Sequence, residues 1–180
     1  YPYKELSGCG VGFKLCQGLN TIYKIPESEL FELTDLLAIS IASDIVAMTG
    51  ENRVLAKQGL KFLRKTRKFG LRLLIPEEKL AHFEISNIVF DIAPKINAAG
   101  RISHAKASVE LMISDNLKQA HQIVNEIVNL NDERREMDIN ITQSALNQVL
   151  ELEKVERYST IVYDPSWNKG VIGIVASRLI

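Results

Sequence analysis

The residues from Asn116 to Arg157 contain neither glycine nor proline. Since these two residues disfavour helices most strongly, the stretch is predicted to form one long helix, about 60 Å from end to end if unbroken. Apolar residues recur at helical spacing near both ends, whereas the middle, Asn131 to Glu136, is polar on every side. A helix that is polar all round at its centre is typical of a connector that bridges two domains through solvent.

The segments on either side of this helix differ in their patterns. The residues before it are predicted to be mostly helical, with Ile85 to Ile92 as a candidate strand. After it, Thr160 to Tyr163 is predicted to be a strand, and Gly170 begins an apolar helical run to Ile180. A strand followed by a helix is typical of an α/β domain. Because the apolar run needs partners to cover it, we expect an interior segment of a larger α/β protein, which self-associates through this run if it is left uncovered.

The formal net charge of zero argues against non-specific binding of nucleic acids. The basic residues are nevertheless concentrated between Asn52 and Pro76, where no acidic residue occurs. Four positions recur at helical spacing and are expected to share one face of a helix: Lys57, Lys61, Arg64 or Lys65, and Lys68. This face is either a solvated helix surface or a surface for the phosphates of a polyanion.

Cys9 and Cys16 are expected to be small buried side chains in a reducing cytoplasm. On one helix they would lie roughly 10 Å apart, which is beyond disulfide reach. The apolar runs are too short to span a bilayer, so we expect a cytoplasmic protein without a membrane partner. Near Cys9, the three glycines of a predicted helix, Gly8, Gly10 and Gly12, indicate that the backbone there closely approaches another group.

Asp44 is the first candidate for a site residue. It lies in the stretch Leu36 to Val46, which is apolar nearly all round and is therefore predicted to be a buried helix. A carboxylate in such a place must be paired, protonated or bound to a metal. Asp44 either accepts a hydrogen bond from a nearby backbone amide at the helix end or serves as a metal ligand. One aspartate cannot hold a divalent cation, so further ligands would lie elsewhere.

A second group of candidates follows Pro94. Side chains at spacings of four, three and four form one polar stripe on a predicted helix: Asn97, Arg101, His104 and Ser108. The guanidinium of arginine is a rigid fork of donors suited to phosphate, so the stripe indicates an anion-binding surface. The alternative is a capped surface helix. Arg178, after a glycine-containing turn, is either a surface residue or a second phosphate donor.

Four segments together carry a resemblance to a known family. In order along the chain they are Lys4 to Leu15, Ser43 to Arg53, Ala93 to Arg101 and Trp167 to Leu179. Their order and spacing resemble the RecJ family of single-strand-specific exonucleases, within the DHH phosphoesterase superfamily. The resemblance covers nearly the whole chain.

The resemblance implies a division of the chain. Residues 1–115 would be the C-terminal part of a DHH domain, residues 116–157 the connector helix, and residues 158–180 the start of a DHH-associated domain that binds substrate. The cleft between such domains holds two Mn²⁺ or Mg²⁺ ions. Asp44 matches the last acidic metal ligand, and Arg101 and Arg178 match contacts to the DNA end or its phosphate. Asn97 and His104 are further candidate contacts.

The function implied is a metal-dependent 5′-to-3′ single-stranded-DNA exonuclease of repair and recombination, with single-stranded DNA and other repair proteins as partners. The family's paired aspartates and Asp-His-His motif do not occur in this chain, so no complete catalytic set is present and the chain alone is expected to be inactive. Asn168 stands where the family typically has histidine. Two alternatives remain open: another phosphodiesterase of the superfamily, acting on short oligonucleotides or a cyclic dinucleotide, and a non-catalytic nucleic-acid-binding module.

Overall fold

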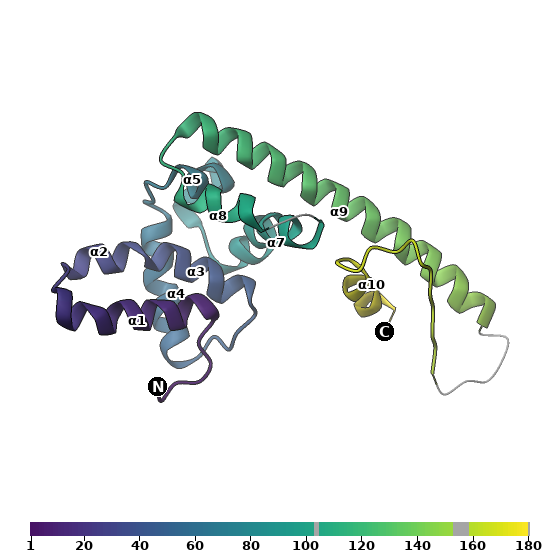
Figure 1. The fold of residues 1–180 in the computed structure, drawn as a ribbon, viewed down its shortest axis with the longest axis horizontal. Helices are drawn as coiled ribbons and strands as arrows, with labels where there is room; N and C mark the ends of the chain where they lie inside the picture. The colour runs from purple at the N-terminus through teal and green to yellow at the C-terminus, as the bar shows by residue number, and fades with distance from the viewer. Residues whose placement is uncertain (103–104, 153–158, 180) are drawn as a thin grey trace.

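The computed structural model describes residues 1–102, 105–152 and 159–179, which form helices joined by turns and loops, with a longer non-helical stretch before the last helix (Figure 1). The first half of the chain contains α1 (Gly8–Tyr23), α2 (Glu27–Glu32), α3 (Thr34–Ser43), α4 (Gly50–Leu63) and α5 (Phe69–Leu74). A 3-10 turn (Glu77–His82) leads to α6 (Ile85–Asn87) and a π-helical turn (Ile88–Ile92), followed by α7 (Ala93–Ile102) and α8 (Lys106–Ile113). The second half contains α9 (Leu117–Leu152) and α10 (Ile172–Arg178).

The mostly helical character predicted from the sequence is confirmed, but both predicted strands are wrong within the described ranges. Ile85 to Ile92 is helical because Ile88 and Ile92, one helical turn apart, are both fully buried in the core. Thr160 to Tyr163 is not assigned to a strand. The side-chain amide of Gln148 accepts from the N–H of Tyr163 at 3.0 Å and donates to its carbonyl at 3.1 Å. That amide therefore stands where a neighbouring strand would pair.

The main core lies among α3, α5, α8 and the N-terminal half of α9. Its largest fully buried side chains include Leu63, Leu71, Phe83, Ile88 and Leu111. A second cluster joins α1, α3 and α4 through Phe13, Leu37, Ile41 and Leu55. Helices α3 and α4 approach so closely that a Cβ at Gly59 would lie 2.1 Å from the carbonyl oxygen of Thr34.

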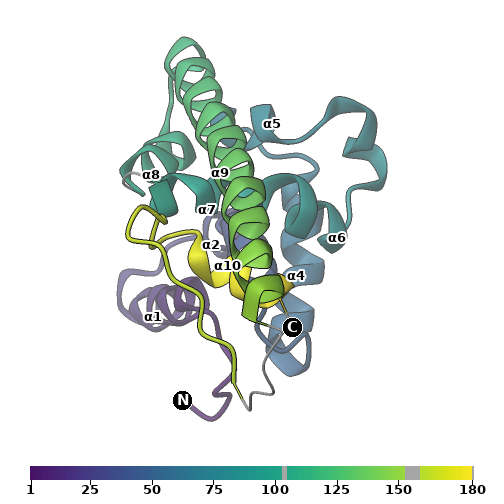
Figure 2. The same ribbon diagram turned by 90° about the vertical axis from the view of Figure 1, so that its right-hand side faces the viewer.

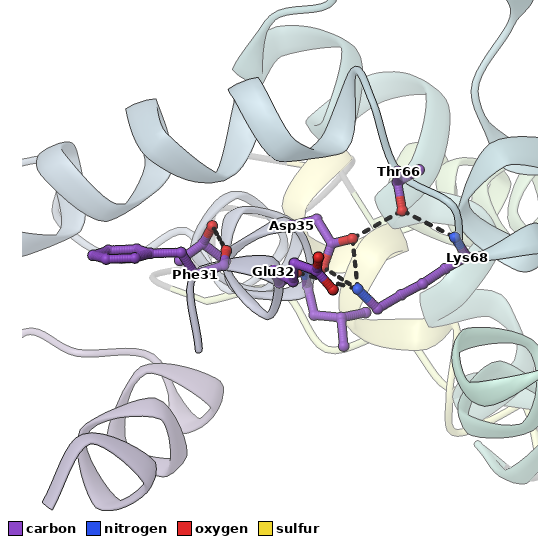
Figure 3. Close-up of polar contacts among 7 residues, drawn as sticks. Phe31, Glu32, Asp35, Thr66 and Lys68 are labelled. Carbon is purple, nitrogen blue, oxygen red and sulfur yellow. Dashed lines mark hydrogen bonds and ion pairs between the residues drawn. The ribbon is translucent and has the colours of Figure 1, made fainter. Parts of the chain in front are cut away.

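A buried carboxylate ties the connection between α4 and α5 to the start of α3. The oxygens of Asp35, which is 2% exposed, accept from Lys68 Nζ at 2.8 and 2.9 Å and from Thr66 Oγ1 at 2.9 Å (Figure 3). The backbone N–H of Leu36 also donates to Asp35, at 2.7 Å. Every partner needed by a buried carboxylate is thus supplied by the chain itself.

The predicted long helix is confirmed as α9, which has 36 residues and spans about 54 Å. Residues 153–158 of the predicted stretch lie outside the described residues. The N-terminal half of α9 packs on α5, α7 and α8, and its C-terminal half lies beside α10 (Figures 1 and 2). The predicted polar centre is only partly solvated. Asp132, Glu133, Arg135 and Glu136 are exposed, whereas Asn131 is 4% exposed and Asp138, two residues beyond the centre, is 1% exposed, and both bind polar partners.

The apolar run near the end of the chain is partly covered. Val171 and Val175 are buried against Ile141 and Ala145 of α9. Ile172 of the same run is 42% exposed. Self-association through this run stays a prediction, as does the division of the chain into domains. Among the residues described, none of the helices is both long and apolar enough to cross a membrane.

One expectation for the N-terminal region is wrong, and a second stays untested. Cys9 is exposed and Cys16 partly buried, so they are not a pair of core side chains. In the described part of the chain a Cβ at Gly8 or Gly12 would meet nothing within 4 Å, whereas one at Gly10 would lie 3.3 Å from Leu6 Cβ. A close approach of another group to Gly8 and Gly12 therefore stays a prediction. These glycines lie on the outer side of α1, where Val11 and Leu15 are also exposed.

Candidate anion-binding cleft

A cleft of about 240 Å³ lies where the end of α3, the helix α7, the middle of α9 and the start of α10 meet. Its polar lining comes from Ser43, Asn97, Arg101 and Arg134, and apolar side chains such as Ile45 and Ile174 complete it. Asp44 lies between two of these lining residues in the sequence. The structure therefore brings two of the predicted site residues, Asn97 and Arg101, into one cleft with the end of α3, where Asp44 stands between two lining residues.

Helix α7 positions Asn97 and Arg101 because its opposite side is anchored. Ala98 and Ala99 are fully buried, and small side chains at these positions let α7 approach α9 closely. Asn97 is left exposed towards the cleft. Ser108, which was predicted to share the polar stripe, is buried instead and donates to the carbonyl of Ile96 at 3.1 Å. His104, another predicted contact, lies outside the described residues.

The turn before α10 is seated on the end of α7. A Cβ at Gly170 would lie 2.2 Å from the carbonyl oxygen of Arg101, so glycine alone permits this approach. Arg101 Nη1 donates to the carbonyl of Gly170 at 3.0 Å, which holds the guanidinium at the mouth of the cleft. Asn168 Oδ1 accepts from the N–H of Gly170 at 2.8 Å and stabilises the turn.

A buried carboxylate on α9 joins two arginines. Asp138 Oδ2 lies 2.8 Å from Arg178 Nη2 and 3.7 Å from Arg134 Nη1, and Asp138 Oδ1 lies 3.5 Å from Thr142 Oγ1. Arg134 Nη2 also donates to Asn131 Oδ1 at 3.1 Å. Arg178, predicted as a phosphate contact, is therefore held by an ion pair while half of its side chain remains exposed.

Positive charge accumulates around this carboxylate. Burial lowers the pKa of the Arg134 guanidinium, and the charges of Arg135, Arg101 and Arg178 lower that pKa further, while Asp138 opposes the shift. Arg134 and Asp138 were not singled out from the sequence. The signal was nevertheless present, because residues 131, 134 and 138 are spaced three and four apart and so share one face of a helix.

Asp44 differs from its prediction in one respect. Helix α3 ends at Ser43, so Asp44 caps the helix and is exposed rather than enclosed in an apolar helix. Its Oδ2 accepts from Ser40 Oγ at 3.0 Å; the structure assigns it no bond from a backbone amide among the residues described. The next residue, Ile45, has a φ of 53° and is 88% exposed. A left-handed conformation is unusual for a β-branched residue and marks local strain beside the cleft.

The residues around Asp44 suit a divalent cation in kind but not in number. A carboxylate is the donor that Mn²⁺ and Mg²⁺ prefer, and the buried Oγ of neighbouring Ser43 has no hydrogen-bond partner in the described part of the chain. No group of three or more His, Cys, Asp and Glu side chains occurs within the described ranges. This chain can therefore supply one carboxylate to a metal site whose other ligands come from elsewhere.

The predicted basic face is divided by the fold. Lys57 and Lys61 are exposed on α4. Arg64 instead donates from Nε and Nη2 to the carbonyl of Phe83, at 3.1 and 2.8 Å. Lys68 lies beyond the end of α4 and is paired with Asp35. Lys65, the alternative to Arg64 at this spacing, is exposed. Arg64 and Lys68 are thus not part of a continuous surface for a polyanion, whereas Lys57, Lys61 and Lys65 remain exposed.

No family profile matches this chain, but curated proteins are similar to it over its full length. The curated single-stranded-DNA-specific exonuclease RecJ of Bacillus subtilis is 39% identical over 185 residues, covering 100% of this chain and 22% of that protein. RecJ of Escherichia coli is 32% identical over 197 residues, covering 99% of this chain and 34% of that protein. The chain therefore spans roughly a fifth to a third of the length of these relatives.

Solved structures give the same relationship. A crystal structure of exonuclease RecJ bound to manganese matches with a TM-score of 0.84 and 31% identity, over 99% of this chain and 45% of that chain. RecJ from Thermus thermophilus in complex with Mg²⁺ matches with a TM-score of 0.84 and 31% identity, over 99% of this chain and 28% of that chain. The resemblance predicted from the sequence motifs is thereby confirmed. The chain belongs to the RecJ family and corresponds to a segment of these longer proteins.

Proposed function

We propose that the intact protein is a metal-dependent nuclease that degrades single-stranded DNA from its 5′ end, in DNA repair and recombination. The observation that carries this proposal is the convergence of Asn97, Arg101 and Arg134 in one cleft, with Asp44 beside it. The proposal is also supported by the relatives that match the whole chain, which are named single-stranded-DNA-specific exonucleases.

The proposed cofactor is Mn²⁺ or Mg²⁺, the ions present in the matching crystal structures. In this chain Asp44 would be the metal-binding residue. When bound, such ions activate a water molecule and neutralise charge on the phosphate. The remaining ligands would come from parts of the protein outside this chain, so the chain alone is expected to show no Mn²⁺-dependent nuclease activity.

The arginines would bind the DNA phosphates. Arg101 uses one N–H on the carbonyl of Gly170, and a guanidinium carries five donors, so further donors remain for an anion. Arg178 would contribute from α10, and Asn97 would add a neutral hydrogen bond. Lys57 and Lys61, which are exposed on α4, would guide the strand by charge.

The central test is the variant Asp44→Ala in the intact protein. We expect it to abolish Mn²⁺-dependent release of nucleotides from 5′-labelled single-stranded DNA, with DNA binding largely kept, because the carboxylate serves the metal and not the strand. The control is Asp132→Ala, which removes an exposed carboxylate from α9. Full activity of Asp44→Ala would remove Asp44 from the metal site. Binding without any turnover by the unaltered intact protein would favour a non-catalytic nucleic-acid-binding module.

A further inference from the structure

Among the described residues, one largely buried cation of the cleft, Arg134, has no counter-ion that it does not share. The side chain of Arg134 is 13% exposed, and it lines the cleft together with Asn97 and Arg101. Its Nη1 lies 3.7 Å from Asp138 Oδ2, which is longer than a hydrogen bond. Arg178 already holds the same oxygen at 2.8 Å. Arg134 is thus mostly withdrawn from water, and in the part of the chain that the structure describes a shared carboxylate balances its charge.

The surroundings of Arg134 make this arrangement costly. Its guanidinium donates a hydrogen bond to the side chain of Asn131, which is neutral. Arg101 and Arg178 are close enough for their positive charges to disfavour the charged form of Arg134. The guanidiniums of Arg134 and Arg178 therefore share the single carboxylate of Asp138, beside a cleft that Arg101 also lines. A buried charge without a partner is strongly unfavourable, and an anion in the cleft would supply that partner.

We propose that Arg134 is a further anion-contacting residue of this cleft, and that the buried carboxylate of Asp138 positions Arg134 and Arg178 towards the same phosphate group. This inference rests on the proposed function, in which Arg101 and Arg178 bind a DNA phosphate. It assigns the middle of α9 a part in binding the substrate as well as in joining the two ends of the fold. Asp138 is a positioning residue, since it acts through the arginines.

A purely structural network would explain the same contacts differently. Asp138 and Arg178 also join α9 to α10, and the loss of such a joint would weaken every activity of the protein alike. A phosphate-positioning network predicts instead a selective loss. Only ligands that place a phosphate in the cleft would bind more weakly, while ligands without that phosphate would bind as before. The experiment must therefore compare ligands that differ in this one group.

The test uses the intact protein without divalent cations, so that DNA is bound and not degraded. Fluorescence anisotropy would measure its affinity for one short single-stranded oligodeoxynucleotide carrying a 5′-phosphate, a 3′-phosphate or no terminal phosphate. Arg134→Gln is expected to lower the affinity for one phosphorylated form by roughly tenfold to a hundredfold, the value of a charge-assisted hydrogen bond. Arg134→Lys, which keeps the charge, should recover part of the loss. Arg135→Gln is the matched control, because Arg135 is the exposed neighbour outside this cleft.

Asp138→Asn separates positioning from contact. Alone, it should reproduce much of the selective loss, because asparagine is isosteric but uncharged. In the double variant Arg134→Gln/Arg178→Gln it should cause no further loss, since the residues through which it acts are gone. An equal loss for all three oligonucleotides, or an additive loss in the triple variant, would overturn the inference.

The outcomes also separate this inference from the proposed function. If the unaltered protein binds all three oligonucleotides equally, or if Arg101→Gln and Arg178→Gln leave its preference unchanged, the proposed phosphate role fails. If those two variants reduce the preference while Arg134→Gln does not, only the assignment of Arg134 is refuted.

Discussion

The contact between Gly170 and the end of α7 yields the sharpest structural prediction. In the variant Gly170→Ala the new Cβ would lie 2.2 Å from the carbonyl oxygen of Arg101 and 3.0 Å from its carbonyl carbon. An ordinary contact begins at 3.4 Å, so the turn must move away from α7 by about 1 Å. Such a shift would stretch the 3.0 Å bond from Arg101 Nη1 to the carbonyl of Gly170 beyond hydrogen-bond length.

The expected cost follows from these two effects. Overpacking of a close contact costs about 1–3 kcal/mol, and the lost hydrogen bond adds about 1 kcal/mol. Because Val171 and Val175 pack with α9 in a cluster separate from the main core, we expect α10 to loosen locally and the main core to stay folded. Hydrogen exchange by mass spectrometry should then show faster exchange of the α10 amides and unchanged exchange in α3 and α5.

The matched control is Gly173→Ala, three residues further along. Its Cβ would meet nothing within 4 Å, and it lies inside α10. Alanine there should leave α10 as stable as before, or more stable by up to about 1 kcal/mol, because alanine favours helix. If Gly170→Ala exchanged its α10 amides as slowly as Gly173→Ala does, the close contact with Arg101 would not govern the docking of α10.

Three further predictions concern other contacts. Lys68→Met removes the cation paired with buried Asp35 and should lower the free energy of unfolding in urea by about 3 kcal/mol. Lys65→Met, at an exposed position, should change this free energy little, and equal effects of the two variants would contradict the role of the ion pair. Ile45→Gly should raise the free energy of unfolding by about 1 kcal/mol, because glycine relieves the strain of the left-handed backbone at this position, whereas Ile45→Val should not. A loss of stability in Ile45→Gly would contradict the claim that the backbone is strained there. In the intact protein, the double variant Lys57→Gln/Lys61→Gln should bind single-stranded DNA with a slope of log K against log[salt] that is smaller in magnitude by up to about 1.4. Arg64→Gln should leave this slope unchanged, because Arg64 is hydrogen-bonded to the carbonyl of Phe83.

The elements predicted correctly are those governed by local interactions. The absence of glycine and proline made α9 predictable, because helix formation depends on neighbours three and four residues away. The polar stripe of α7 was predicted for the same reason, and the structure places Asn97 and Arg101 of that stripe in the cleft. Residue types and spacing therefore identified two of the four polar side chains that line the cleft before any tertiary contact was known.

The errors arose where a distant part of the chain decided the outcome. Ile85 to Ile92 has a pattern that suits either a strand or a helix, and its burial against the main core selects the helix. Arg64 and Lys68 resemble solvated charges in the sequence, yet the carbonyl of Phe83 and the carboxylate of Asp35 bind them from elsewhere in the fold.

The same reason explains why Arg134 and Asp138 were missed. Their sequence surroundings are those of a solvated helix face, and Arg134 belongs to the stretch that was predicted to be the exposed middle of a connector. The packing of α7 and α10 against α9 buries this face and brings Arg101 and Arg178 to it. The sequence by itself determined which helices form and which side chains share a face. Only the tertiary structure decided which faces meet, because burial and ion pairing depend on residues far apart in the chain.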